Sequence, residues 1–167
     1  MNSRDLTDRH SPYGPQWEAR QKALKLDTGE DWLKPDEIDC LERFQDLEPD
    51  IPLAVKITWI SRDEDAFLPT DDFEWTANGC VHVEMKRVYR ADYSAIHDAI
   101  NGTVKRLKRT HPGMTGVKES FMVFLGGRKV TDGLRIKLED YNIKNPSNPI
   151  KQLWLVWDGH LEKIDLG

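Results

Sequence analysis

The chain has 167 residues, a formal net charge of −5 and two cysteines, and these values already exclude several protein classes. The length predicts one domain with a hydrophobic core of its own. No apolar run approaches the roughly 18–20 residues that cross a bilayer, and the charged N-terminus lacks a signal-peptide core, so we expect no membrane segment. Cys40 and Cys80 fit neither a metal-ligand spacing nor a disulfide framework, which favours reduced thiols.

Charge is distributed unevenly along the sequence. Residues 1–80 carry 9 Lys and Arg against 19 Asp and Glu, a net charge of −10, whereas residues 81–167 carry 15 against 10, a net charge of +5. This asymmetry is compatible with an acidic, metal-attracting rim beside a basic surface, a pattern that enzymes of nucleic acids can use. It is equally compatible with ordinary solvated faces.

Residues 1–33 predict an N-terminal arm that is partly irregular. Residues 1–15 have no apolar period, residues 16–26 predict a short amphipathic helix, and a turn follows at residues 27–30. We expect the domain itself to span residues 34–167.

The domain opens with a helix that begins at Lys34-Pro35-Asp36-Glu37 and ends before Pro49. Proline and acidic residues suit a first helical turn, where backbone donors lack partners and the helix dipole is positive. The apolar stripe of this helix is Ile38, Leu41, Phe44 and Leu47. Glu37 lies on the same side as the stripe, either as a first-turn charge in contact with solvent or as a buried functional carboxylate.

Three strands follow, and the last two form a hairpin. Residues 53–60 alternate apolar and polar positions, and residues 61–65 form a charged loop. Asn78-Gly79 then predicts a tight turn, because a type I′ turn needs two residues that accept positive φ. The strand after the turn alternates cleanly: Val81, Val83 and Met85 point to one face, and His82, Glu84 and Lys86 point to the other.

The second half predicts two helices and three strands. Residues 93–109 form the longest helix, with an apolar face and a basic outer side. Residues 121–125 are continuously apolar, which is typical of a strand buried on both faces. A helix from Thr131 to about Tyr141, a loop over residues 142–149, and a closing hairpin complete the chain. The closing strands are residues 152–157 and 161–164, and the second helix is expected to turn Leu134, Ile136 and Leu138 mostly inward.

The hairpin is also where candidate chemistry gathers. Glu84 and Lys86 lie two residues apart on one strand face, about 6–7 Å along it. The turn folds Asp71 or Asp72, at the start of the preceding strand, back toward this pair. Two carboxylates and a lysine on one face can hold a divalent metal ion and position a water molecule.

The order α-β-β-β-α-β-α-β-β predicts an α/β fold with a mixed β-sheet and flanking helices, and together with these motifs it resembles the PD-(D/E)xK nuclease superfamily. That superfamily has a restriction-endonuclease-like core of order α-β-β-β-α-β, here followed by a helix and a hairpin. Its acidic residue begins the second core strand, at the place of Asp72, and its E-x-K lies on the third, at the place of Glu84-Met85-Lys86. The helix start at residues 34–37, Asp72-Phe73 and the strand at residues 153–156 are similar to the C-terminal nuclease (tRNase) domains of contact-dependent growth-inhibition toxins. Thr70-Asp71-Asp72 departs from the Pro-Asp that names the motif, and Phe73 favours Asp72.

The resemblance implies a metal-dependent nuclease that acts on RNA, with tRNA favoured, or on DNA. Asp72, Glu84 and the Met85 carbonyl would ligate Mg²⁺ or Mn²⁺, Lys86 would assist catalysis, and Glu37 would complete the metal shell. Candidate contacts to the nucleic acid are His82, Lys105, Lys108 and Arg109. A toxin of this kind would act in the cytoplasm of a target cell, delivered as part of a larger protein, and would have a cognate immunity protein as a partner.

Two other interpretations stay open from the residues alone. A metal-independent ribonuclease could use His82, His97, His111 and Lys86 in general acid–base catalysis. A non-catalytic interaction module, such as an immunity or antitoxin protein, could bind a basic partner through the acidic first half of the chain.

Overall fold

The computed structural model describes residues 10–25, 28, 32–47, 57–60, 69–76 and 81–167. Several predicted features lie outside this part of the chain: the Asn78-Gly79 turn, the loop at residues 61–65, the first half of the strand at residues 53–60, Cys80, and nearly all of the turn at residues 27–30.

Within the described part, Cys40 is a free, buried thiol, and burial raises its pKa to about 12.

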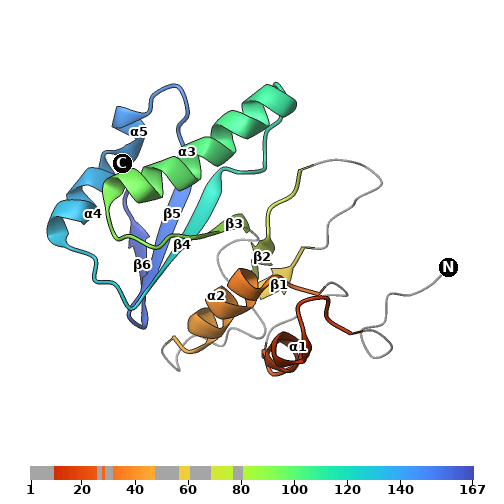
Figure 1. Ribbon diagram of the computed structural model, residues 1–167. Coiled ribbons are helices and arrows are strands. Elements are labelled where there is room, and N and C mark those ends of the chain that lie inside the picture. The colour runs from red at the N-terminus through yellow and green to blue at the C-terminus, as the bar shows by residue number, and fades with distance from the viewer. Residues whose placement is uncertain (1–9, 26–27, 29–31, 48–56, 61–68, 77–80) are drawn as a thin grey trace.

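A mixed sheet forms the centre of the molecule (Figure 1). Its strands in the described residues are β1 (Ile57–Trp59), β2 (Phe73–Trp75), β3 (Val81–Arg87), β4 (Ser120–Gly126), β5 (Gln152–Trp157) and β6 (His160–Ile164), and they pair in that order. β1, β2 and β3 are antiparallel neighbours, β3, β4 and β5 run parallel, and β6 is antiparallel to β5. The predicted α/β class with a mixed sheet is therefore confirmed, as are the pairing of the central hairpin and the closing hairpin.

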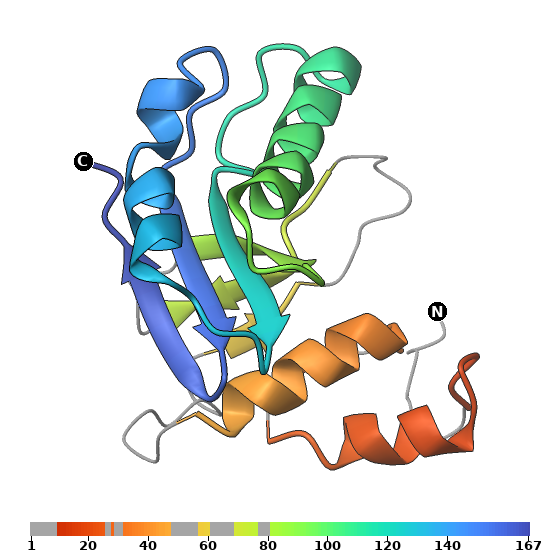
Figure 2. The same cartoon turned by 60° about the vertical axis from the view of Figure 1, so that its left-hand side comes forward.

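Helices cover both faces of the sheet (Figure 2). On one face, α2 (Pro35–Gln45) packs on residues of β1 to β5, and α1 (Pro15–Lys22) packs on α2. On the other face lie α3 (Tyr93–Thr110), α4 (Asp132–Glu139) and α5 (Tyr141–Lys144). The core accordingly has two parts, one under α2 and one under α3 to α5. None of the helices in the described part of the chain combines the length and apolarity that a membrane span requires.

Local signals explain where the helices begin. The Lys34 N–H donates to Glu37 Oε1 over 2.8 Å, in front of the proline that opens α2. Asp92 caps α3 by accepting from the Ala95 N–H, and Thr131 caps α4 by accepting from the Leu134 N–H. Such caps satisfy donors that a helix leaves without an intrahelical partner. The predicted starts of all three helices are confirmed within two residues.

Three expectations about the helices are wrong in detail. The N-terminal helix is shorter than residues 16–26 and ends at Lys22. α5 covers the first part of the loop expected at residues 142–149, because Asn145 side-chain bonds close its C-terminal end on Tyr141. Ile136 is 61% exposed, since Leu134 and Leu138 define the buried stripe of α4 and a residue midway between them points to the opposite side. The domain boundary at residue 34 stays a prediction.

Candidate active site

β3 brings a glutamate and a lysine together beside the edge of the core. Glu84 is only 7% exposed, and its Oε1 lies 3.6 Å from Lys86 Nζ. Lys86 is partly exposed, with 26% of its side chain accessible. The expected placement of both side chains on one face of the strand is met, and the glutamate is far more buried than an ordinary surface residue.

Asp72 is fixed against β3 by its backbone and by its side chain. Its N–H donates to the Val83 carbonyl (3.0 Å), and its own carbonyl accepts from the Ile60 N–H (2.9 Å). Its Oδ2 accepts from the Met85 N–H over 2.7 Å. Burial raises the pKa of Asp72 to about 7, and the negative charges of Glu84 and Glu37 act in the same direction. Asp72 and Glu84 therefore share one site, as the hairpin predicts.

Asp71 lies at the same site but is held differently. It is 2% exposed, and its Oδ1 accepts the Lys118 N–H over 2.9 Å. Its Oδ2 is buried without a hydrogen-bond partner among the described residues. Burial raises the pKa of Asp71, against the opposing effect of Lys118. The two acids that the sequence could not separate thus have different partners: Asp72 contacts the strand that carries Glu84, and Asp71 contacts the loop before β4.

Lys118 is a member of the site that the sequence analysis missed. Its ammonium donates to Glu84 Oε2 and to the Thr70 carbonyl, and it lies 3.9 Å from Asp71 Oδ1. The signal that could have found it is the strand register, because Glu84 pairs with Phe121 at the start of β4, three residues after Lys118. That register follows only from the parallel pairing of strands far apart in the sequence.

Glu37 lies in the first turn of α2, where its Oε1 accepts the Lys34 N–H. Its negative charge contributes to the raised pKa of Asp72, so it is close enough to act on that carboxylate. Both interpretations of Glu37 retain support: it caps its own helix, and it adds negative charge to the site.

The basic residues expected to contact nucleic acid lie at the end of α3. Lys105, Lys108 and Arg109 are exposed, and the Lys108 ammonium donates to the Ser147 carbonyl. α3 ends near the start of β4, and the loop of residues 111–119, which contains Lys118, connects the two elements (Figure 2). His82 is exposed on β3, and its positive form lowers the pKa of Asp71.

The three histidines of the metal-independent alternative are not brought together. His82 lies on β3, His97 bonds Asn145 Oδ1 and Asp98 Oδ1, and His111 ends α3 with its ring against Thr110. Because no contact in the described part of the chain joins one of these rings to another, that alternative gains no support from the geometry.

Whether the site suits a metal ion depends on its oxygen atoms. No group of three or more His, Cys, Asp or Glu side chains in the described ranges has the arrangement of a ready-made metal centre. The donors here are instead carboxylates: the charge of Glu84 raises the pKa of Asp71 and Asp72, and Asp71 Oδ2 is buried without a hydrogen-bond partner among the described residues. Hard cations such as Mg²⁺ and Mn²⁺ prefer such oxygen donors and need few protein ligands. In the structure the Lys118 ammonium already pairs with the Glu84 carboxylate and lies 3.9 Å from Asp71 Oδ1, so part of the negative charge of the site is neutralised by the protein itself.

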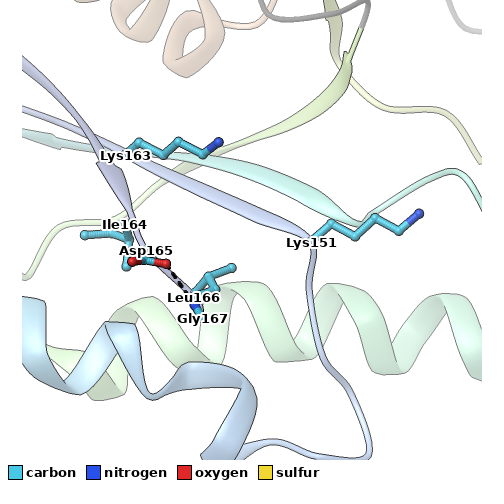
Figure 3. Close-up of a pocket in the computed structure, with 6 residues that line it drawn as sticks. All are labelled: Lys151, Lys163, Ile164, Asp165, Leu166 and Gly167. Atoms are coloured by element: carbon cyan, nitrogen blue, oxygen red, sulfur yellow. Dashed lines mark hydrogen bonds between the residues drawn. The ribbon is translucent and has the colours of Figure 1, made fainter.

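A separate hollow of about 360 Å³ lies at the β6 edge of the sheet, next to the residues that follow β6 (Figure 3). Its lining residues are Lys151, Lys163, Ile164, Asp165, Leu166 and Gly167. Lys151 pairs with Glu119 over 2.8 Å, and Lys163 lies over the Trp154 ring. The hollow contains none of the residues gathered around Glu84.

Comparison with protein-family models, with curated proteins and with solved structures finds no match to this chain. Its function is therefore inferred from its own residues.

Proposed function

We propose that this protein is a metal-dependent nuclease of the PD-(D/E)xK type, which hydrolyses phosphodiester bonds in nucleic acid. One observation carries the proposal: Asp72, directly before β2, is held by the Met85 N–H of β3 and is close enough to Glu84 for that charge to act on it, and Glu84 lies beside Lys86. A carboxylate whose pKa is raised by burial and by a neighbouring carboxylate, as that of Asp72 is, is costly to maintain, and such groups cluster at functional sites.

The arrangement of the elements supports the same proposal. α2 precedes three consecutive strands, β1 to β3, and α3 then connects β3 to the parallel strand β4. This succession agrees with the α-β-β-β-α-β order of the restriction-endonuclease-like core. Asp72 stands directly before β2 and Glu84 stands on β3, which are the places of the acidic residues in that core.

The residues that would hold Mg²⁺ or Mn²⁺ are Asp72, Glu84 and the Met85 carbonyl, with Glu37 as a further acid near Asp72. When bound, the ion polarises a phosphodiester oxygen and lowers the pKa of a coordinated water. The Met85 N–H holds Asp72 Oδ2 at 2.7 Å, so that the carboxylate cannot rotate freely. This fixed orientation reduces the reorganisation that the reaction requires.

Lys86 has the position of a charge-stabilising group. Its ammonium is partly exposed and 3.6 Å from Glu84 Oε1, so it reaches solvent, where a substrate phosphate would lie. Negative charge grows on the phosphoryl oxygens as the water oxygen attacks phosphorus and the bond to the leaving oxygen breaks. A fixed positive charge stabilises this state more than the ground state.

The exposed cations at the end of α3 are the groups that we propose would bind the substrate backbone. Lys105 and Arg109 lie on the side of the sheet where Lys118 enters the site, and such residues hold phosphate groups without reading bases. We propose RNA, and tRNA in particular, as the first substrate to test, with DNA as the second. Toxin delivery and a cognate immunity protein belong to this proposal and rest on the sequence resemblance.

The test is a cleavage assay on mixed tRNA, single-stranded RNA and plasmid DNA, each with Mg²⁺, with Mn²⁺ and with EDTA. The wild type is compared with Glu84→Gln and with Glu139→Gln, a matched control at an exposed position of α4. We expect cleavage that needs metal, is lost in Glu84→Gln and is kept in Glu139→Gln. Cleavage that survives both EDTA and Glu84→Gln would contradict the proposal, and absence of cleavage in every lane would favour the interaction module.

A further inference from the structure

Lys118 enters the site from the loop before β4, and the loop backbone is shaped to place it. Its φ of +56° lies in the left-handed region, which is unfavourable for a residue with a side chain. The strained residue donates its own N–H to Asp71 Oδ1 over 2.9 Å. Backbone strain of this kind persists where surrounding contacts over-determine the conformation.

The Lys118 ammonium is surrounded by oxygens of the site. It donates to Glu84 Oε2 and to the Thr70 carbonyl, and Asp71 Oδ1 lies at 3.9 Å. Two of the three donors of the ammonium are used by the Glu84 carboxylate and the Thr70 carbonyl, and Asp71 Oδ1 lies within ion-pair distance but beyond hydrogen-bond reach. The side chain is only 15% exposed. Lys118 is therefore placed to act on the carboxylates and not on a substrate.

The two oxygens of Glu84 consequently have different partners. Oε2 accepts from Lys118, whereas Oε1 lies 3.6 Å from Lys86. Lys118 thus fixes the rotation of the Glu84 carboxylate. Its positive charge also offsets the repulsion among Asp71, Asp72 and Glu84, as its lowering effect on the pKa of both aspartates indicates.

We propose that Lys118 is a positioning residue with two opposed effects on a divalent cation at this site. It orients Glu84 for the reaction, and its positive charge competes with the cation for the same carboxylate. This inference rests on the proposed function, because it concerns the metal that Asp72 and Glu84 would hold. Its consequence is unusual: loss of the lysine charge should strengthen metal binding and weaken cleavage together.

The experiment measures Mn²⁺ affinity by titration calorimetry and single-turnover cleavage at saturating Mn²⁺. The variants are Lys118→Met, Lys118→Gln and Lys118→Arg, with Lys137→Met at an exposed position of α4 as the control. Without the nearby positive charge, we expect Mn²⁺ to bind on the order of tenfold more tightly to the Met and Gln variants. Because Glu84 loses its orientation, we expect their cleavage to fall about 10²-fold. Lys118→Arg keeps the charge and should bind Mn²⁺ like the wild type.

A purely structural role for Lys118 predicts a different result, namely weaker Mn²⁺ binding and slower cleavage together. Weaker or unchanged binding in Lys118→Gln would overturn the inference, and that variant also decides the matter if Lys118→Met does not fold. If Lys118→Gln cleaves like the wild type and binds Mn²⁺ with unchanged affinity, the inference about Lys118 is overturned and the proposed function is not. A wild type that binds Mn²⁺ but cleaves nothing would overturn the proposed function, and the affinity comparison would still test Lys118. Failure of the wild type to bind Mn²⁺ would overturn both.

Discussion

β3 and β4 are neighbouring parallel strands of seven residues each, yet they differ in almost every chemical respect. Every residue of β4 is buried, with Met122 and Phe124 under α2 and Phe121, Val123 and Leu125 under the other helices. β3 contributes Val83 and Met85 to the core under α2, and none of its described residues belongs to the core under α3. The opposite face of β3 carries Glu84, which is buried, and Lys86, which is partly exposed.

The difference shows what each strand provides. A strand packed on both faces cannot hold charges without a large desolvation cost, so β4 serves as support. A strand packed on one face can hold a buried carboxylate at the border of the core, where Lys86 still reaches solvent. The candidate site therefore lies where helix coverage of the sheet ends.

The largest effect expected on the β3 side is from Lys86→Met. Removing the ammonium should slow cleavage about 10³-fold, because charge on the phosphoryl oxygens loses its stabilising partner. Single-turnover kinetics at saturating Mn²⁺ would measure the loss. Unfolding by urea should show stability close to that of the wild type, since the side chain is partly exposed. Cleavage at the wild-type rate would contradict the assigned role.

The buried acids of the site predict an unusual pH dependence of stability in metal-free protein. The pKa of Asp72 is about 7 in the fold, above its ordinary value of about 3.9. Between these values the folded protein keeps a proton that the unfolded chain has lost, so the free energy of unfolding falls as pH rises from about 4 to about 7. Below pH 4 both states are protonated, and this destabilisation is absent.

Asp72→Asn should remove most of that fall, because asparagine can still accept the Met85 N–H and carries no charge. The unfolding free energy of the variant minus that of the wild type should therefore increase as pH rises from 4 to 8. The increase should reach about 4 kcal/mol, because each unit of pKa shift corresponds to about 1.4 kcal/mol. Urea unfolding in EDTA across this range would measure the gain. A difference between the two proteins that does not change with pH would contradict the buried, repelled state of Asp72.

The matching change on the β4 side is Leu125→Ala. Leu125 is fully buried under α3 to α5, and the cavity left by its truncation should lower the unfolding free energy by about 3 kcal/mol. At temperatures where the variant stays folded, its cleavage rate should match the wild type. Loss of activity in the folded variant would contradict the assignment of β4 as a strand that only supports the fold, with the reacting groups on β3.

The smallest effects are expected from the exposed cations at the end of α3. Lys105→Gln and Arg109→Gln should each weaken binding of an RNA oligonucleotide about threefold and reduce the slope of log affinity against log salt by about one. Lys137→Gln, on α4 near the opposite end of α3 (Figure 1), serves as the control. An unchanged salt slope in both variants would indicate that these residues do not contact phosphate groups and form an ordinary solvated helix end.

Much of this architecture follows from local sequence patterns, because each pattern coincides with a buried face. The continuous apolar run of β4, the period of α3 and the alternation in β3 each report which side of an element meets the core. The same alternation predicts that Glu84 and Lys86 lie together, and the hairpin brings an acid from the residues directly before β2 toward them.

The remaining features depend on contacts between distant segments. Lys118 reaches Glu84 only because β4 pairs in parallel with β3, which no local pattern encodes. Ile136 was misplaced because three apolar residues at alternate positions of a short helix cannot all face inward, and only packing selects Leu134 and Leu138. The different partners of Asp71 and Asp72 likewise depend on distant segments, since the Lys118 N–H holds Asp71 and the Met85 N–H holds Asp72.

The proposed function requires Asp72 and Glu84 to form one cation site. Calorimetric titration of metal-free protein with Mn²⁺ at pH 8 tests it most directly, with Glu84→Gln, Asp72→Asn and the control Glu139→Gln beside the wild type. We expect saturable binding to the wild type and to Glu139→Gln, and binding weakened by at least about tenfold in the other two variants. Equal affinity in all four proteins, or no binding to any of them, would contradict it.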